Sequence, residues 1–129
     1  MKALFQKLSP EWILRLTLGV MYLYSGIDLV RHPTAWYWAI RPLPDAIQTV
    51  IQFVGMDHFL VMQGIVELIF AAVLIVWFVP KIFVNIVALF TAIEMAAILL
   101  LVGIDGVTFR DIAILGSALA LFIIRLRKI

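Results

Sequence analysis

The sequence lacks cysteine and holds few charged residues. Without cysteine, the chain by itself has no disulfide, thiol relay, iron–sulfur cluster or cysteine zinc site. Charged residues make up 14% of the 129 residues, against about 25% in soluble domains. No run of Lys or Arg is of the kind that indicates nucleic-acid binding. These absences exclude thiol chemistry and argue against a nucleic-acid partner.

Apolar residues make up 65% of the chain, against about 45–50% in soluble domains. A soluble domain of this size has too little interior to hide so much apolar surface, because small domains have a high ratio of surface to volume. The apolar residues gather in four segments, and a helix of about 20 apolar residues crosses a bilayer core. The sequence therefore predicts an all-α protein, a transmembrane four-helix bundle formed by a single domain over residues 1–129.

Proline and capping residues set the expected helix boundaries. Ser9 and Pro10 favour a helix start, since serine caps free N–H groups and proline lacks one. Pro33 ends this helix, and Pro80 separates the second helix from the third, which predicts that those two are antiparallel neighbours. Arg125 is expected to snorkel from the last helix to the membrane surface. The expected helices span about 10–31, 58–79, 81–103 and 109–126.

The connection between the first and second helices is less apolar than the helices. It opens with the aromatic cluster Trp36–Trp38, which is typical of the headgroup level of a membrane. A short amphipathic helix is expected over about 45–54, with Gln48 and Gln52 facing water and an apolar stripe in the membrane surface. The stripe consists of Ile47, Val50, Ile51 and Val54. A lid folded over the bundle is the alternative interpretation.

Basic residues predict the orientation, because cytoplasmic loops carry an excess of Lys and Arg. One predicted side holds Lys2, Lys7, Arg15, Lys81, Arg125, Arg127 and Lys128. The other side holds Arg31, Arg41 and Arg110. We therefore expect a multi-pass protein of the cytoplasmic (plasma) membrane with both termini in the cytoplasm.

Polar residues at membrane depth are the candidates for function. An ionised side chain at the bilayer centre costs at least about 2.5–3.5 kcal/mol, so it needs a partner, a proton or a water-filled cavity. Glu67 and Glu94 are the charged residues inside the second and third segments, and Gln63 lies one turn before Glu67. With Arg15 and Tyr22 on the first helix, they form the predicted ligand-binding site. Arg15 starts near the inner surface, where it either anchors the helix at the membrane interface or reaches toward Glu67, since a pair would lower the cost of both charges.

Three glycines indicate where the helices approach each other closely. Gly19 and Gly26 share a face of the first helix with Arg15 and Tyr22, and Gly64 lies beside Gln63 on the second helix. Polar side chains also hold membrane helices together by hydrogen bonds. A purely structural role for the polar residues is therefore the alternative to a binding site.

Recognisable catalytic motifs are missing from the sequence. It has no nucleophile–base pair, phosphate loop or HExxH helix. His32 and His58 are both expected at the outer surface, but no ligand spacing supports a metal or haem site there. We therefore assign no catalytic residue, no metal and no cofactor to the chain itself, and an enzyme activity of the isolated chain is not expected.

The same residues resemble the DoxX-like family of small four-helix membrane proteins. The matching features are Arg15-x3-Gly19 and Ser25-Gly26, then His32-Pro33, a tryptophan-rich connection and Gly64-x-x-Glu67, over about residues 12–125. Two positions depart from the family pattern. Leu29 stands in the region where members often carry a lysine, and Lys81 replaces an arginine that opens the third helix. The resemblance implies a membrane subunit associated with redox systems, with Arg15, Gly19, Gly26, Gly64 and Glu67 as its candidate positions.

Three hypotheses for the function follow. The first is an accessory subunit of a membrane redox system that binds a quinone headgroup near Glu67 and works with a protein partner, because a chain without haem or flavin motifs cannot pass electrons far. The second is a small proton-coupled transporter, or a protein that binds a lipid or isoprenoid, in which Glu67 and Glu94 carry protons. The third is a structural scaffold of the membrane. The partner of the chain, besides the lipid bilayer, is expected to be another protein or further copies of itself.

Overall fold

The computed structural model describes residues 9–103 and 109–127. These residues form helices without any strand, which confirms the all-α class. Lys2, Lys7 and Lys128, which entered the predicted orientation, lie outside the described residues. The long helices are α2 (Pro10–Arg31), α5 (Met56–Ile75), α6 (Lys81–Val102) and α7 (Phe109–Arg127). The short ones are η1 (Pro33–Trp36), α3 (Tyr37–Ile40) and α4 (Asp45–Val54).

Within the described residues, α2, α5 and α6 are long and apolar enough to cross a membrane, with mean hydropathies of 1.4, 2.1 and 2.3. Helix α7 differs because Arg110 and Asp111 lie at its start and Arg125 and Arg127 in its last turn. Its uncharged stretch, 112–124, is about 20 Å long, whereas a bilayer core is about 30 Å thick. Length and composition therefore identify three spans, where the sequence predicted four.

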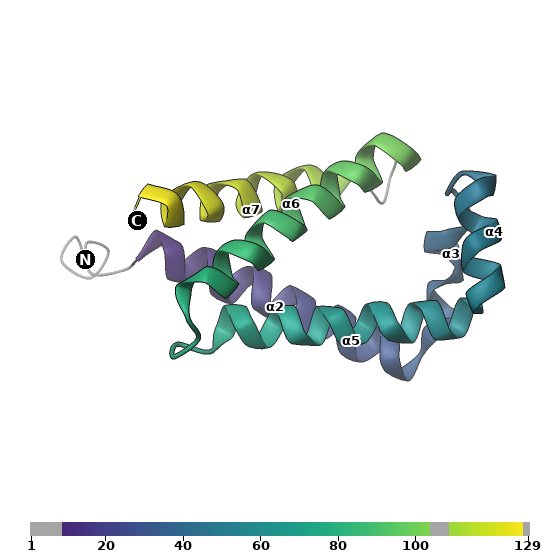
Figure 1. Ribbon diagram of the computed structural model, residues 1–129, viewed down its shortest axis with the longest axis horizontal. Coiled ribbons are helices and arrows are strands. Elements are labelled where there is room, and N and C mark those ends of the chain that lie inside the picture. Colours follow the sequence, from purple (N-terminus) through teal and green to yellow (C-terminus); the bar gives the residue numbers. More distant parts are fainter. Residues whose placement is uncertain (1–8, 104–108, 128–129) are drawn as a thin grey trace.

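The long helices pack as two pairs (Figure 1). Helix α2 lies along α5, and α6 lies along α7, while α2 with α7 and α5 with α6 make smaller contacts. The two pairs approach each other near the start of α2 and diverge toward the end where α3 and α4 lie. The expectation that the second and third helices are close neighbours is thus only partly met, since α5 packs mainly on α2 and α6 mainly on α7.

Glycines explain why α2 and α5 pack so closely. A Cβ atom added at Gly26 would lie 2.9 Å from the carbonyl oxygen of Gly64, and one added at Gly64 would lie 2.9 Å from that of Gly26. Farther along the pair, a Cβ atom at Gly19 would lie 2.6 Å from the side chain of Ile75. The two backbones therefore touch at Gly26 and Gly64, an approach that small residues permit in membrane helices.

The core of the fold has two parts. The first holds Leu18, Tyr22, Ala71, Leu74, Val84, Val87, Ala88 and Leu121, contributed by all four long helices. The second lies at the other end and joins α4 and α3 to α2 and α5 through Leu29, Ile40, Ile51 and Leu60. Large apolar side chains also cover the outside of the long helices, including Val20, Met62 and Phe90. Such an apolar exterior is typical of a protein with lipid as its solvent.

Helix α4 combines the two interpretations of the amphipathic segment. Ile51 is buried and Ile47 packs against the second core, so this side of α4 is folded over the bundle, as the alternative interpretation expected. Val50 and Val54 are exposed, at 63% and 49%. Gln48, which was expected to face water, instead donates hydrogen bonds to the carbonyl oxygens of the preceding turn, at 2.8 and 2.7 Å. The apolar stripe is therefore divided between the bundle and the exterior, because α4 packs with one edge.

Candidate functional site

A cavity of about 680 Å³ lies between the diverging helix pairs and the lid formed by η1 and α3. Its volume is within the range of about 300–1,000 Å³ that is usual for ligand sites. The walls are mostly apolar, and polar side chains come from each of the four long helices. Those side chains are Tyr22, Ser25, Gln63, Glu67, Glu94 and Asp111.

Glu67 occupies the α5 wall of this cavity. Ser25 on α2 donates a hydrogen bond from Oγ to Glu67 Oε2 at 2.8 Å. This bond depends on the glycine contact, because Ser25 precedes Gly26 and Glu67 follows Gly64 by one turn on the same helix. The close approach of the two backbones brings a short serine side chain within reach of the carboxylate.

Gln63 connects the α5 wall to the α6 wall. It lies one turn before Glu67 and donates a hydrogen bond from Nε2 to Glu94 Oε1 at 2.9 Å. Glu94 is partly buried and also lines the cavity. The structure thus brings the predicted residues Glu67, Gln63 and Glu94 to one cavity, with both carboxyl groups held by neutral donors.

Tyr22 lies deeper than the carboxyl groups, at the junction of the cavity with the first core. Its hydroxyl donates a hydrogen bond to Thr91 Oγ1 at 2.9 Å, and both residues are almost fully buried. The ring packs edge-on against Phe70, with centroids 5.6 Å apart. Tyr22 therefore fixes the spacing of α2 and α6, and Thr91 lies one turn before Glu94 on α6.

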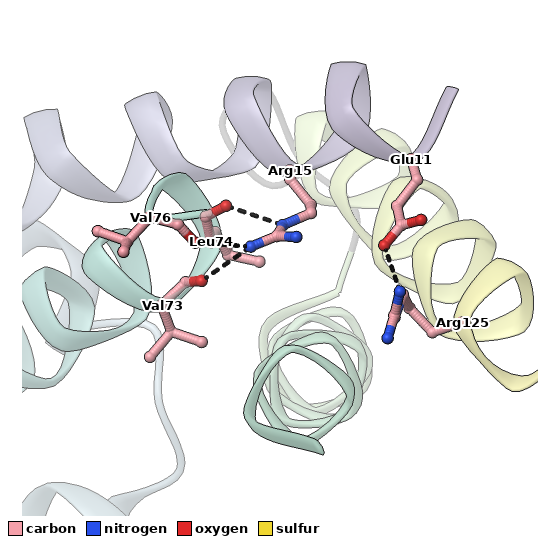
Figure 2. Close-up of polar contacts among 6 residues, drawn as sticks. All are labelled: Glu11, Arg15, Val73, Leu74, Val76 and Arg125. Atoms are coloured by element: carbon pink, nitrogen blue, oxygen red, sulfur yellow. Dashed lines mark hydrogen bonds and ion pairs between the residues drawn. The ribbon is translucent and has the colours of Figure 1, made fainter. Parts of the chain in front are cut away.

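Arg15 lies outside this cavity, contrary to the prediction that it reaches toward Glu67. Its guanidinium donates hydrogen bonds to the carbonyl oxygens of Val73, Leu74 and Val76, at 3.3, 2.9 and 3.0 Å (Figure 2). These carbonyls belong to the C-terminal end of α5, where backbone groups lack helical partners and a positive charge is favourable. The ring of Trp12 covers the guanidinium at 4.0 Å.

The expected second helix, over 58–79, ends earlier than predicted, and Arg15 lies beside its end. Helix α5 stops at Ile75, and Val76 is extended with φ −74° and ψ 130°. Arg15 binds carbonyl oxygens on both sides of that change in the backbone. An arginine from α2 thus caps the end of α5.

A buried ion pair near Arg15 was not predicted. Arg125 Nη1 lies 2.7 Å from Glu11 Oε1, and the two side chains are only 4% and 5% exposed. Figure 2 shows the pair bridging α2 and α7. The expectation that Arg125 snorkels to the surface is wrong, because the antiparallel path of the chain places the start of α2 beside the end of α7. Glu11 lies at the start of the first predicted helix and Arg125 at the end of the fourth, and in the predicted bundle these two ends lie on the same side, so the sequence contained a signal for this pair.

Sequence reasoning also missed two parts of the cavity. Ser25 was not among the predicted site residues, although its partner Glu67 was. Trp36 and Trp38 line the cavity from the lid, with stacked rings whose centroids are 5.6 Å apart. Trp36 Nε1 donates a hydrogen bond to Asp28 Oδ2 at 2.8 Å, which anchors the lid to the end of α2. The Ser25–Glu67 bond depends on how α2 and α5 cross, and the place of the tryptophans depends on how the connection folds back. Local patterns specify neither.

A second polar contact anchors the lid to α5. Tyr37 on α3 donates a hydrogen bond to the Asp57 carboxylate, and this bond raises the pKa of Tyr37 above its ordinary value. His58 follows directly, at the exposed start of α5. Among the described residues, no group of three or more His, Asp and Glu side chains is placed to hold a metal ion.

Comparisons with protein-family models, with curated proteins and with solved structures found no match to this chain. The function therefore has to be argued from the chemistry of the cavity. Three carboxyl groups, an amide, a hydroxyl and aromatic rings on the walls of one mostly apolar cavity can bind a molecule that is mostly apolar and has one polar or charged group. The carboxyl groups can also take up and release protons.

Proposed function

We propose that the chain is an integral membrane protein with both termini in the cytoplasm and α7 as a fourth span. The support for α7 is its contact along α6 and the burial of Arg125 against Glu11, which removes one charge from the lipid-facing surface. Since α6 is long and apolar enough to span, a helix packed along it crosses the same layer. The cavity then faces the outer half of the membrane.

We further propose that this protein binds a membrane-soluble molecule in the cavity and exchanges it for protons. The observation that carries this proposal is that Glu67 and Glu94 line one apolar cavity and receive hydrogen bonds from the neutral donors Ser25 and Gln63. None of the described residues that line the cavity is Lys, Arg or His. Each carboxylate, if ionised there, costs at least about 2.5–3.5 kcal/mol. A proton or a bound ligand therefore neutralises the carboxylate. Because the ligand replaces the proton, ligand binding is coupled to proton release.

Infrared spectroscopy of the protein in lipid bilayers tests the proton part of this proposal without a known ligand. Protonated carboxyl groups give a carbonyl stretching band that ionised groups lack. At neutral pH the wild type should show this band, and Glu67→Gln and Glu94→Gln should each remove part of it. Asp45→Asn is the matched control, because Asp45 is exposed at the start of α4 and does not line the cavity. A wild-type spectrum without protonated carboxyl at neutral pH would overturn the proposal.

A second candidate function is the accessory redox subunit that the DoxX-like resemblance implies. The observation in its favour is that two carboxyl groups, the Gln63 amide and the Ser25 hydroxyl surround one apolar cavity. Oxidation of a quinol releases two protons and two electrons, so the carboxyl groups would accept the protons and a partner protein the electrons. Mass spectrometry and absorption spectra of molecules carried by the purified protein test this role. A stoichiometric quinone that is lost in Glu67→Gln would favour it over proton-coupled exchange.

A further inference from the structure

We infer that the ligand class of this cavity is a hydrophobic organic cation, such as a lipophilic quaternary or protonated amine. The inference rests on the proposed binding function and adds the charge of the ligand. The cavity is large enough for a molecule with several rings, at about 680 Å³. Three features of the fold indicate the sign of the ligand's charge. They are the charge of the cavity wall, its aromatic residues and the position of the two buried arginines.

Acidic side chains supply all the formal charge among the described residues of the cavity wall. Glu67, Glu94 and Asp111 come from α5, α6 and α7, and no basic side chain accompanies them on that wall. A low-dielectric cavity of one charge sign strengthens attraction to the opposite sign. An anionic ligand would find no opposite charge on this wall, whereas a cation can replace the protons that neutralise Glu67 and Glu94.

Aromatic residues add a second attraction for cations. Trp36 and Trp38 line the cavity from the lid, and Tyr22 and Phe59 line it from α2 and α5. Aromatic rings attract cations through their quadrupole, tryptophan most strongly, and desolvated sites gain the most. The hydrogen bond from Trp36 to Asp28 holds one of these rings in place before a ligand arrives.

The two buried arginines of the fold are held away from the cavity. Arg15 is bound to the carbonyl oxygens at the end of α5, and Arg125 is paired with Glu11. Neither residue is part of the cavity wall. The positive charges of these two buried side chains therefore lie away from the cavity.

A pair of probes with the same shape and opposite charge tests this inference: tetraphenylphosphonium and tetraphenylborate. Binding to the full chain in lipid nanodiscs is measured by equilibrium dialysis against empty nanodiscs of the same lipid. We expect the phosphonium to bind saturably, and we expect the affinity for the borate to be at least about tenfold weaker. Acidification should weaken phosphonium binding, because protons compete for the same carboxyl groups. Binding of the borate as tight as that of the phosphonium would overturn the inference.

Variants locate the binding and separate this inference from the function on which it rests. Glu67→Gln should lose at least about tenfold in phosphonium affinity, since one compensating charge is removed. Glu67→Asp, which keeps the charge, should retain most of it, and Asp45→Asn should bind like the wild type. Equal binding by wild type and Glu67→Gln would place the probe elsewhere and overturn the inference. If the neutral triphenylphosphine oxide binds and both ions do not, the cation inference fails while ligand binding in the cavity stands.

Discussion

Removal of the carboxylate of Glu11 should destabilise the fold more than removal of its partner. Glu11 and Arg125 form an ion pair at 2.7 Å in which both side chains are almost fully buried. Arg15 projects from the same side of α2 one turn farther on (Figure 2). Glu11→Gln leaves two arginines in one interior region without this carboxylate. Arg125→Met leaves one acid and one base there.

The magnitude follows from the cost of an uncompensated buried charge. Breaking a buried ion pair by removing one partner typically costs about 3–5 kcal/mol, because the remaining charge stays desolvated. Arg125 Nε and Nη2 also lack hydrogen-bond partners among the described residues, so the loss of Glu11 leaves a guanidinium with little to hold it. We expect Glu11→Gln to lower the free energy of unfolding by about 3–5 kcal/mol. The Glu11→Gln/Arg125→Met double variant should lose less than Glu11→Gln alone, since it buries no charge of this pair.

Unfolding in mixed detergent micelles, followed by circular dichroism, gives the four free energies of this double-mutant cycle. The coupling free energy should be about 2 kcal/mol or more. Tyr24→Phe is a suitable control, because Tyr24 is 75% exposed on the outside of α2. Additive losses in the double variant would refute the reasoning, and with it the contact between the start of α2 and the end of α7.

Three further predictions concern packing and capping. Gly64→Ala should lower the free energy of unfolding by about 1–3 kcal/mol, because its Cβ would lie 2.9 Å from a carbonyl oxygen of α2. Gly116→Ala is the control, because its Cβ would meet nothing within 4 Å, and it should raise the free energy of unfolding by about 0.5–1 kcal/mol. Equal shifts of the two variants in thermal unfolding would contradict the close contact at Gly64. Tyr22→Phe should lower the free energy of unfolding by about 1–2 kcal/mol, since the buried hydroxyl of Thr91 loses its partner. An unchanged free energy of chemical unfolding would argue against that hydrogen bond. Arg15→Met should increase hydrogen exchange of the last turn of α5, and unchanged protection there would show that the arginine does not cap the helix.

The helical elements could be predicted from the sequence where a local signal fixed them. Pro10 and Pro80 mark the starts of α2 and α6, since proline suits the first turn of a helix and interrupts its interior. The long apolar runs predicted membrane helices, and α2, α5 and α6 have the length and hydropathy to span. Helix α7 was harder, because charged residues at both ends shorten its apolar stretch and its place depends on contact with α6.

The site was only partly predictable. The sequence shows which polar residues lie within apolar runs, but it does not show which side chains of other helices they contact. Glu67 and Glu94 were candidates since a carboxyl group within an apolar run is costly. Their hydrogen bonds to Ser25 and Gln63 depend on which helix faces meet. The glycine contact brings α2 onto α5 for the first bond, whereas the second joins α5 to α6. Arg15 was assigned to the wrong partner for the same reason. The carbonyl oxygens at the end of α5 became its partners because α5 ends beside it, a boundary that no local signal marks.

Carbodiimide labelling tests the central claim most directly, namely that the carboxyl groups of the cavity carry protons in a membrane. Dicyclohexylcarbodiimide is apolar, enters from the lipid and reacts with protonated carboxyl groups. We predict that peptide mass spectrometry of the labelled protein in bilayers will find the adduct on Glu67 or Glu94, decreasing as the pH rises. Glu11, paired with Arg125, should remain unlabelled. Labelling confined to exposed carboxyl groups such as Asp45, with Glu67 and Glu94 unmodified at every pH, would contradict the account.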